Sequence, residues 1–265
     1  CPEGDSQDQY GVGGLGIKAL LIAIQFLTII PVAPRLVVKD AELTASLSYF
    51  PLVGLMLGCI VLGIDSSLRG ICTVQSLGVI DAAALAFLTR GLHLDGLSDT
   101  FDALGSGKPA EEALVIMKDS RIGAFGAVSL MFVLLLKASA LSTASQKGLW
   151  QVFLLAPCLS RWGLNVLAAS STYARPSGGL GAAFVGGKTR RTLFFSGLTA
   201  FSAAWFLSGM AGLLISLGAV VCGLAASFYF KRRFGGVTGD MLGAFLELTE
   251  AVFMVAGGVY APRGA

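Results

Sequence analysis

Three aspartates in the segment HLDGLSDTFDA have the type and spacing to bind a metal ion. Asp95, Asp99 and Asp102 follow one another at i, i+4 and i+7, so on a helix they share one face. Carboxylates this close repel one another and need a counter-charge, and oxygen-only ligands suit Mg²⁺ or Mn²⁺. The alternative is a solvated acidic face at a helix start, where carboxylates suit the macrodipole. Because the rest of the stripe is apolar, we predict a metal site.

Two further aspartates are candidates to complete this site or to act as a general base. Asp119 lies with Arg121 in KDSRIGAFG, just before an apolar run, and Asp240 begins the last one. Asp119 and the serine after it also suit a helix N-cap, so capping alone can explain them. As a functional pair, Asp119 is a ligand or base and Arg121 a phosphate contact. The spacing does not choose among Asp102, Asp119 and Asp240 as the base.

A glycine-rich segment, residues 171–191, carries cations suited to phosphate. Arg175 and Lys188 flank its glycines, and flexible backbone beside guanidinium and ammonium groups is typical of phosphate binding. Arg190 and Arg191 are better explained as cytoplasmic anchors of the following span than as phosphate contacts. We therefore predict Arg175 and Lys188, with Arg121, as the phosphate contacts.

Three other titratable residues belong to the candidate substrate site or to buried structure. His93, the one histidine in the chain, adjoins the acidic run and is a metal ligand, a phosphate contact or a structural residue at a helix end. Glu247 and Glu250 lie in the last apolar run, where carboxylates are costly and usually face a functional cavity. We assign Glu247 to substrate binding. Glu250 needs a partner such as Lys137 or Arg161, and the alternative to a functional role for Glu250 is a structural buried ion pair.

The elements that must position these residues are membrane helices. The chain has 265 residues, of which 55% are hydrophobic and 13% charged, against about 25% charged in soluble domains. Its mean hydropathy is +0.78. Apolar runs near 20 residues predict an all-α polytopic bundle of seven or eight spans, as one domain, after a disordered tail at residues 1–14. The predicted spans are 17–33, 48–68, 74–92, 122–142, 149–170, 192–208, 210–230 and 240–259, with a hairpin or a broken segment between the sixth and seventh.

The Lys and Arg residues of the connections predict the orientation. One alternating set of connections holds only Lys18, Arg69, Lys147 and Arg263, and the other holds the rest of the loop cations, among them Arg121, Arg175 and Lys188. The richer set is expected in the cytoplasm. It also contains the acidic and glycine-rich motifs, so we expect the active site to face the cytoplasm.

Carboxylates for a metal, cations for phosphates and a membrane scaffold together favour transfer of a phosphoryl-linked group. An ion-coupled transporter is the main alternative from another class, but it predicts an internal repeat and ionisable groups at the bilayer midplane. The net charge of +3 gives no reason to expect nucleic acid as a partner. Glycine-rich helix faces permit a homo-oligomer.

Several long motifs, in order, resemble those of the cobalamin synthase family, the adenosylcobinamide-GDP ribazoletransferases. The resemblance runs from about residue 18 to 258. It is carried by FLTIIPV, YFPLVGLMLG, GLHLDGLSDTFDAL, MKDSRIGAFG, LSRWG, YARPSGGLGAAF and FGGVTGDMLGAFLELTE.

The resemblance implies a specific reaction. Such enzymes join α-ribazole, or its 5′-phosphate, to adenosylcobinamide-GDP, and they release GMP and adenosylcobalamin or its 5′-phosphate. They are expected to use Mg²⁺ and to lie in the prokaryotic cytoplasmic (inner) membrane, among lipids. The Asp-Gly-x-x-Asp core is also similar to that of the CDP-alcohol phosphotransferases, so a lipid-head-group phosphotransferase stays the nearest alternative. Their full motif has more intervening residues and is not matched here.

Overall fold

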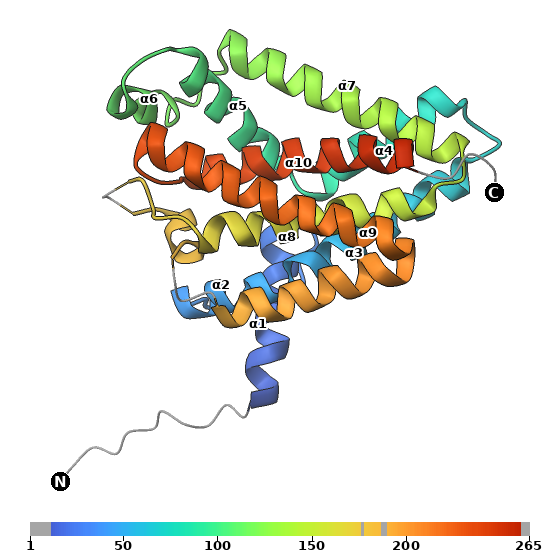
Figure 1. Ribbon diagram of the computed structural model, residues 1–265, viewed down its shortest axis with the longest axis horizontal. Coiled ribbons are helices and arrows are strands. Elements are labelled where there is room, and N and C mark those ends of the chain that lie inside the picture. Colours follow the sequence, from blue (N-terminus) through green and yellow to red (C-terminus); the bar gives the residue numbers. More distant parts are fainter. Residues whose placement is uncertain (1–11, 176–177, 187–189, 261–265) are drawn as a thin grey trace.

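The computed structural model describes residues 12–175, 178–186 and 190–260, and these parts are helical, without a β-strand. Figure 1 shows the long helices lying side by side as a bundle. The all-α membrane bundle predicted from composition is confirmed. The helices are α1 (Val12–Leu27), α2 (Asp40–Ser46), α3 (Phe50–Leu68), α4 (Val74–Leu88), α5 (Leu92–Gly105), α6 (Ala110–Ile116), α7 (Ala124–Gln146), α8 (Trp150–Ala169), α9 (Arg190–Phe234) and α10 (Gly239–Tyr260), with short 3₁₀ turns η1 (Leu47–Tyr49) and η2 (Leu180–Phe184).

Five helices within the described residues are long and apolar enough to cross a membrane, or six if α4 and α5 count as one broken span. The predicted number of spans, seven or eight, is therefore not confirmed. One of the five, Arg191–Phe234, contains a break at Gly209, whose φ of 54° is not helical. In Figure 1 the two halves of α9 run back alongside each other, and Gly212 packs on the backbone of Ala204. Of the two alternatives left open by the sequence, a hairpin or a broken segment, the break therefore makes the hairpin.

The span predicted over 17–33 is wrong. Helix α1 ends at Leu27, and its apolar part, Gly16–Leu27, is shorter than the roughly 20 residues a span requires. Pro31 and Pro34 follow the helix and cannot continue it, although the sequence stays apolar. Figure 1 shows α1 crossing the direction of the long helices instead of lying along them.

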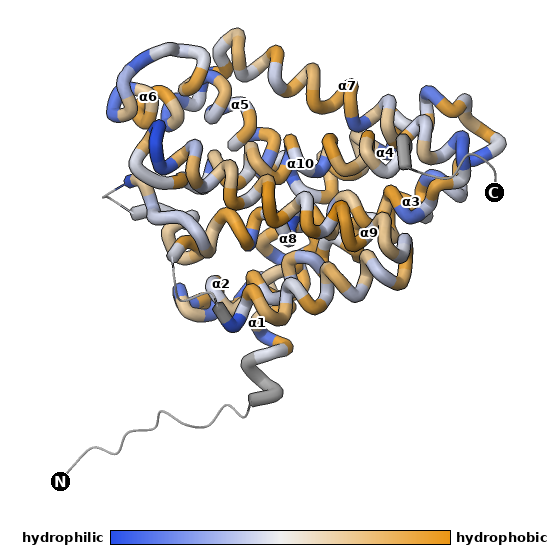
Figure 2. The backbone as a smooth tube through the Cα atoms, in the orientation of Figure 1, coloured by the Kyte–Doolittle hydropathy of each residue, from blue (hydrophilic) through white to orange (hydrophobic). Residues whose placement is uncertain are grey.

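Helix α8 forms the centre of the bundle, with most of its residues buried among α3, α9 and α10. Glycines make the close approach possible: Gly54 and Gly58 of α3, one turn apart, lie against the backbone of Pro157 and Phe153. The outward faces of α7 and α9 carry exposed Phe, Leu and Val side chains. Figure 2 shows that hydrophobic residues run along the helices and that hydrophilic residues gather at the connections.

The predicted connection 93–121 is largely helical, because it contains α5 and α6. Helix α5 turns away from α4 by 93° after a break of a few residues. At this break Arg90 and Gly91 both have positive φ, of 55° and 64°. The α6 segment, η2 and the α9–α10 turn lie at one end of the bundle, on the left in Figure 1.

Candidate active site

The site is built where α5 packs against the first turns of α10. Gly96 of α5 lies on the backbone of Asp240, and Gly243 of α10 lies on the backbone of His93. A Cβ on Gly243 would come within 3.2 Å of the His93 Cα and carbonyl oxygen. Small residues at both contacts let the two backbones approach, and this brings the acidic face of α5 next to Asp240.

Four carboxylates meet at this junction. Asp95, Asp99 and Asp102 share one face of α5, as their spacing predicts. The charges acting on Asp99 come from Asp95, then Asp240 and Asp102, with Arg175 opposing them. Asp95 is exposed, and the other three aspartates are half-buried. The structure therefore brings together Asp240 and Arg175, which are far from α5 in the sequence, with the α5 aspartates.

Arg175 is held at the site by a short stretch of paired backbone. The Ala174 amide donates to the Val237 carbonyl at 2.9 Å, and the Val237 amide donates to the Thr172 carbonyl at 2.9 Å. This pairing fixes the segment before α10 alongside the glycine-rich segment. Nη2 of Arg175 then donates to Oδ2 of Asp240 at 2.9 Å, in a pair with side-chain exposures of 15% and 26%.

Asp102 has a structural partner that the sequence did not indicate. Its two carboxylate oxygens accept the backbone amides of Gly123, at 2.7 Å, and Gly126, at 2.8 Å. Gly126 lies in the first turn of α7, whose free amides require acceptors. The capping role considered for Asp119 and the serine after it is therefore wrong, because Asp102 supplies the acceptor for α7 from another helix.

Asp119 and Arg121 form an exposed pair of their own. Arg121 Nε donates to Asp119 Oδ1 at 3.0 Å, and Nη2 donates to Oδ2 at 2.6 Å. Hydrogen bonding to this guanidinium lowers the pKa of Asp119 to about 2. Asp119 is not among the charges acting on Asp99. The structure thus does not bring this pair into the carboxylate cluster.

His93 lies beneath the cluster and is 4% exposed. It lines a cavity of about 170 Å³ together with Asp95, Asp240 and the backbone of Gly181 and Gly239. Within the described residues its Nδ1 has no hydrogen-bond partner. His93 is thus at the floor of the candidate site, where the predicted substrate contact is geometrically possible.

Glu247 belongs to a buried ion network instead of the cluster. Lys137 Nζ binds Glu247 Oε2 at 2.5 Å and Glu250 Oε1 at 2.6 Å, and Arg161 Nη1 binds Glu250 Oε2 at 2.7 Å. All four side chains are at most 5% exposed. The partners predicted for Glu250 are both confirmed. The contacts of Glu247 favour the structural ion pair over its predicted substrate role.

Two predicted site features have no direct structural description. Lys188 lies outside the described residues. In the parts of the chain that the structure covers, no three His, Cys, Asp or Glu side chains are arranged to hold a metal ion as they stand. The donor groups of the α5 face nevertheless suit a hard cation, because they are carboxylate oxygens. The guanidinium that acts on them is that of Arg175.

A multi-pass membrane bundle with carboxylates and an arginine gathered at one end is suited to an enzyme that acts on phosphorylated substrates, and comparison with known proteins is more specific. The chain belongs to the cobalamin-5-phosphate synthase family, whose model matches residues 19–258. No solved structure gives a significant match.

Three curated relatives carry the name adenosylcobinamide-GDP ribazoletransferase. The protein of Geotalea daltonii is 36% identical over 90% of this chain and 96% of its own length. The protein of Syntrophobacter fumaroxidans is 39% identical over 88% and 95%. The protein of Citrobacter koseri is 40% identical over 81% and 88%.

Proposed function

We propose that this chain is an enzyme that joins α-ribazole or its 5′-phosphate to adenosylcobinamide-GDP. The observation that carries the proposal is the family match over residues 19–258, with relatives of one name over most of both chains. The site agrees with it, since a diphosphate substrate requires cations and charge-stabilising groups. The family description, cobalamin-5-phosphate synthase, favours the phosphorylated acceptor.

The proposed reaction is a single displacement at phosphorus. The 3′-hydroxyl oxygen of the acceptor ribose attacks the phosphorus attached to the cobinamide arm, and a new P–O bond forms. The P–O bond to the GMP moiety breaks, and GMP leaves with its electron pair. The hydroxyl proton passes to a carboxylate, for which the cluster offers Asp95, Asp99 and Asp240.

We also propose that the site uses Mg²⁺. The ion, when bound, would neutralise charge on the diphosphate. Asp95, Asp99 and Asp240 are the residues proposed to hold it, because both oxygens of Asp102 already accept backbone amides. Arg175 would bind a phosphate oxygen once its ion pair with Asp240 opens. Asp102 would then set the position of α7 against the acidic face.

The proposed location is the prokaryotic cytoplasmic (inner) membrane, with the site facing the cytoplasm. It is supported by the Lys and Arg residues of the connections near α6, η2 and the α9–α10 turn, which lie at one end of the bundle in Figure 1, where Asp240 begins α10. This end would meet water-soluble nucleotide substrates directly.

Turnover of adenosylcobinamide-GDP with α-ribazole 5′-phosphate by the purified chain tests the proposal, with Mg²⁺ and with EDTA. Cobalamin phosphate formed only with metal supports both parts. Product that still forms in EDTA supports the transfer reaction and overturns the proposal that the site uses Mg²⁺. If the folded protein forms no cobalamin phosphate but transfers a lipid head group, the proposal is overturned in favour of a lipid phosphotransferase.

A further inference from the structure

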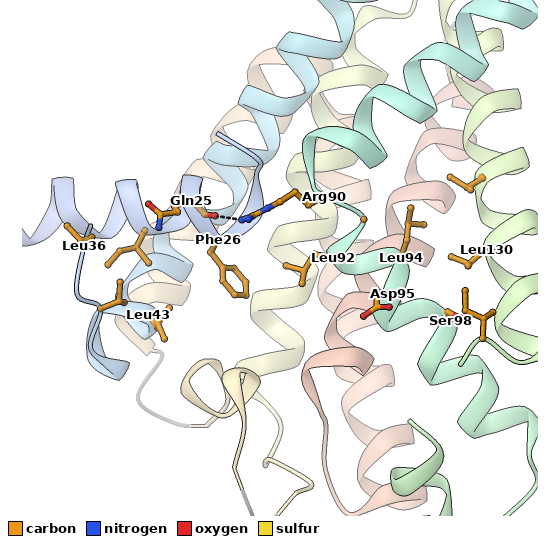
Figure 3. A pocket seen from close by; sticks show the side chains of 15 residues that line it. Gln25, Phe26, Leu36, Leu43, Arg90, Leu92, Leu94, Asp95, Ser98 and Leu130 are labelled. Carbon is orange, nitrogen blue, oxygen red and sulfur yellow. Dashed lines mark hydrogen bonds between the residues drawn. The ribbon is translucent and has the colours of Figure 1, made fainter. Parts of the chain in front are cut away.

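A large cleft of about 850 Å³ opens beside the carboxylate cluster (Figure 3). Its walls come from α1, α2 and the segment between them, from the break between α4 and α5, and from α5 and the region of α7. Most of the lining side chains are apolar, among them Phe26, Leu36, Leu43, Leu92, Leu94 and Leu130. Its volume lies in the range of about 300–1,000 Å³ that is typical of small-molecule pockets.

The cleft and the 170 Å³ cavity next to Asp240 share one wall. Phe26, Leu92 and Asp95 line both of them. Asp95 thus lies between two compartments, one large and apolar, the other bordered by Asp240. A reaction between two substrates requires such an arrangement, because the reacting groups must meet while the remaining parts of the molecules stay apart.

Arg90 is the only cation lining the larger compartment, among the described residues. Its Nη2 donates to the carbonyls of Gln25, at 3.0 Å, and Thr28, at 3.2 Å, at the end of α1. This anchors the guanidinium at the cleft, as Figure 3 shows for Gln25. Arg90 has a left-handed φ of 55°, which is uncommon for a residue other than glycine.

The remaining donors of Arg90 are available to a ligand. Its Nε and Nη1 have no hydrogen bond within the parts of the chain that are described, and the residue is exposed. Ser98, in the wall of the same cleft, has a buried hydroxyl without a partner there. A planar guanidinium with two free donor nitrogens is suited to a phosphate group.

We propose that this cleft is the acceptor subsite, in which the apolar walls hold an uncharged bicyclic aromatic base and Arg90 binds the 5′-phosphate of the same nucleotide. The inference rests on the proposed function and deepens it, since it makes Arg90 the residue that selects the phosphorylated acceptor. The ribose then lies near Leu92, and its 3′-hydroxyl faces Asp95.

The charged residues at each compartment assign the two substrates to the same compartments. The diphosphate of the donor requires cations, and Arg175 provides one next to Asp240, outside the large cleft. The cleft has a single cation and mostly hydrocarbon walls, which suit an aromatic base with one phosphate. Asp95, at the shared wall, is positioned where the acceptor hydroxyl and the donor phosphorus meet.

The test compares two acceptors within each variant, because their ratio cancels any general damage. For the unaltered chain, the KM for α-ribazole 5′-phosphate should be lower than that for α-ribazole by about tenfold to a hundredfold. In Arg90→Gln this ratio should fall to near one, and Arg90→Lys should be intermediate, with the KM for adenosylcobinamide-GDP unchanged. Arg232→Gln, at an exposed arginine on α9, is the control.

A second pair of variants tests the cleft without touching Arg90. Leu130→Trp should fill the cleft and raise the KM for both acceptors, while Leu135→Trp, 68% exposed on the same helix, should not. An acceptor ratio that persists in Arg90→Gln, or that is near one in the unaltered chain, overturns the assignment of Arg90. Unchanged acceptor KM values in Leu130→Trp overturn the subsite. Failure of the proposed function is distinguishable, because the unaltered chain would then show no turnover.

Discussion

Gly96 of α5 lies directly on the backbone of Asp240 in α10. A Cβ on Gly96 would be 2.7 Å from the Asp240 carbonyl oxygen and 2.9 Å from its Cα. Backbone atoms cannot move aside as a flexible side chain can. The distance between the acidic face of α5 and Asp240 therefore depends on the absence of a single methyl group.

Gly96→Ala should separate α5 from α10 and reduce kcat by on the order of 10–100-fold, because small displacements of catalytic groups are costly. The protein should still be extracted as a folded species, since the change adds one methyl group. Steady-state turnover and thermal unfolding in detergent measure the two effects. Gly63→Ala is the matched control, because a Cβ at that α3 position has no atom within 4 Å. Equal activity in both variants would contradict the role of the contact.

Asp99→Asn should abolish turnover while leaving the fold intact. The change removes a negative charge from a group whose neighbours include Asp95 and Asp240, so repulsion in the folded state falls. Thermal stability should therefore be equal or higher, although activity is lost. Asp40→Asn, at the exposed start of α2, serves as the control. If Asp99→Asn turned over substrate normally in Mg²⁺, the metal proposal would fail.

The helices could be predicted from the length of the apolar runs, and their directions could not. The runs gave α3, α7, α8 and α10 within a few residues, and the hairpin in α9. The same reasoning extended α1 too far, because it counted the apolar residues 28–33 that follow the end of the helix at Leu27, and it placed α5 in a connection. Hydrophobicity measures how well a segment tolerates lipid, whereas the turn between α4 and α5 depends on the left-handed backbone at Arg90 and Gly91.

The site was predicted best where charge had to be compensated. Glu250 required partners in an apolar bundle, and both Lys137 and Arg161 were foreseeable on that ground. The partners of Asp102 could not be predicted, because they are backbone amides at the start of α7, and backbone groups do not depend on side-chain type. The sequence pattern gave no reason to select Arg90, because its position on the cleft follows from the bend between α4 and α5.

Glu250→Gln should destabilise the protein more than Glu247→Gln. Glu250 binds both cations of the buried network, so its loss leaves Arg161 without a counter-charge, and breaking such a pair costs about 3–5 kcal/mol. After Glu247→Gln, Lys137 keeps Glu250 and the effect should be smaller. Thermal unfolding in detergent measures both. A KM change in Glu247→Gln without loss of stability would instead support its predicted role in substrate binding.

Asp119→Asn should change kcat little between pH 6 and 9. Hydrogen bonding to Arg121 lowers the pKa of Asp119 to about 2, so at neutral pH this carboxylate is a weak base. Because the pKa is lower in the folded chain than in the unfolded one, the pair stabilises the fold above the ordinary aspartate value. That contribution disappears as the pH falls toward 2, and it is small because both groups are exposed. The pH profiles of kcat in Asp119→Asn, Asp95→Asn and Asp240→Asn test whether the base is Asp119 or a carboxylate of the cluster. A loss of the acidic limb, where a base becomes protonated, in the Asp119 variant alone would make Asp119 the base, whereas we expect that loss in a variant of the carboxylate cluster.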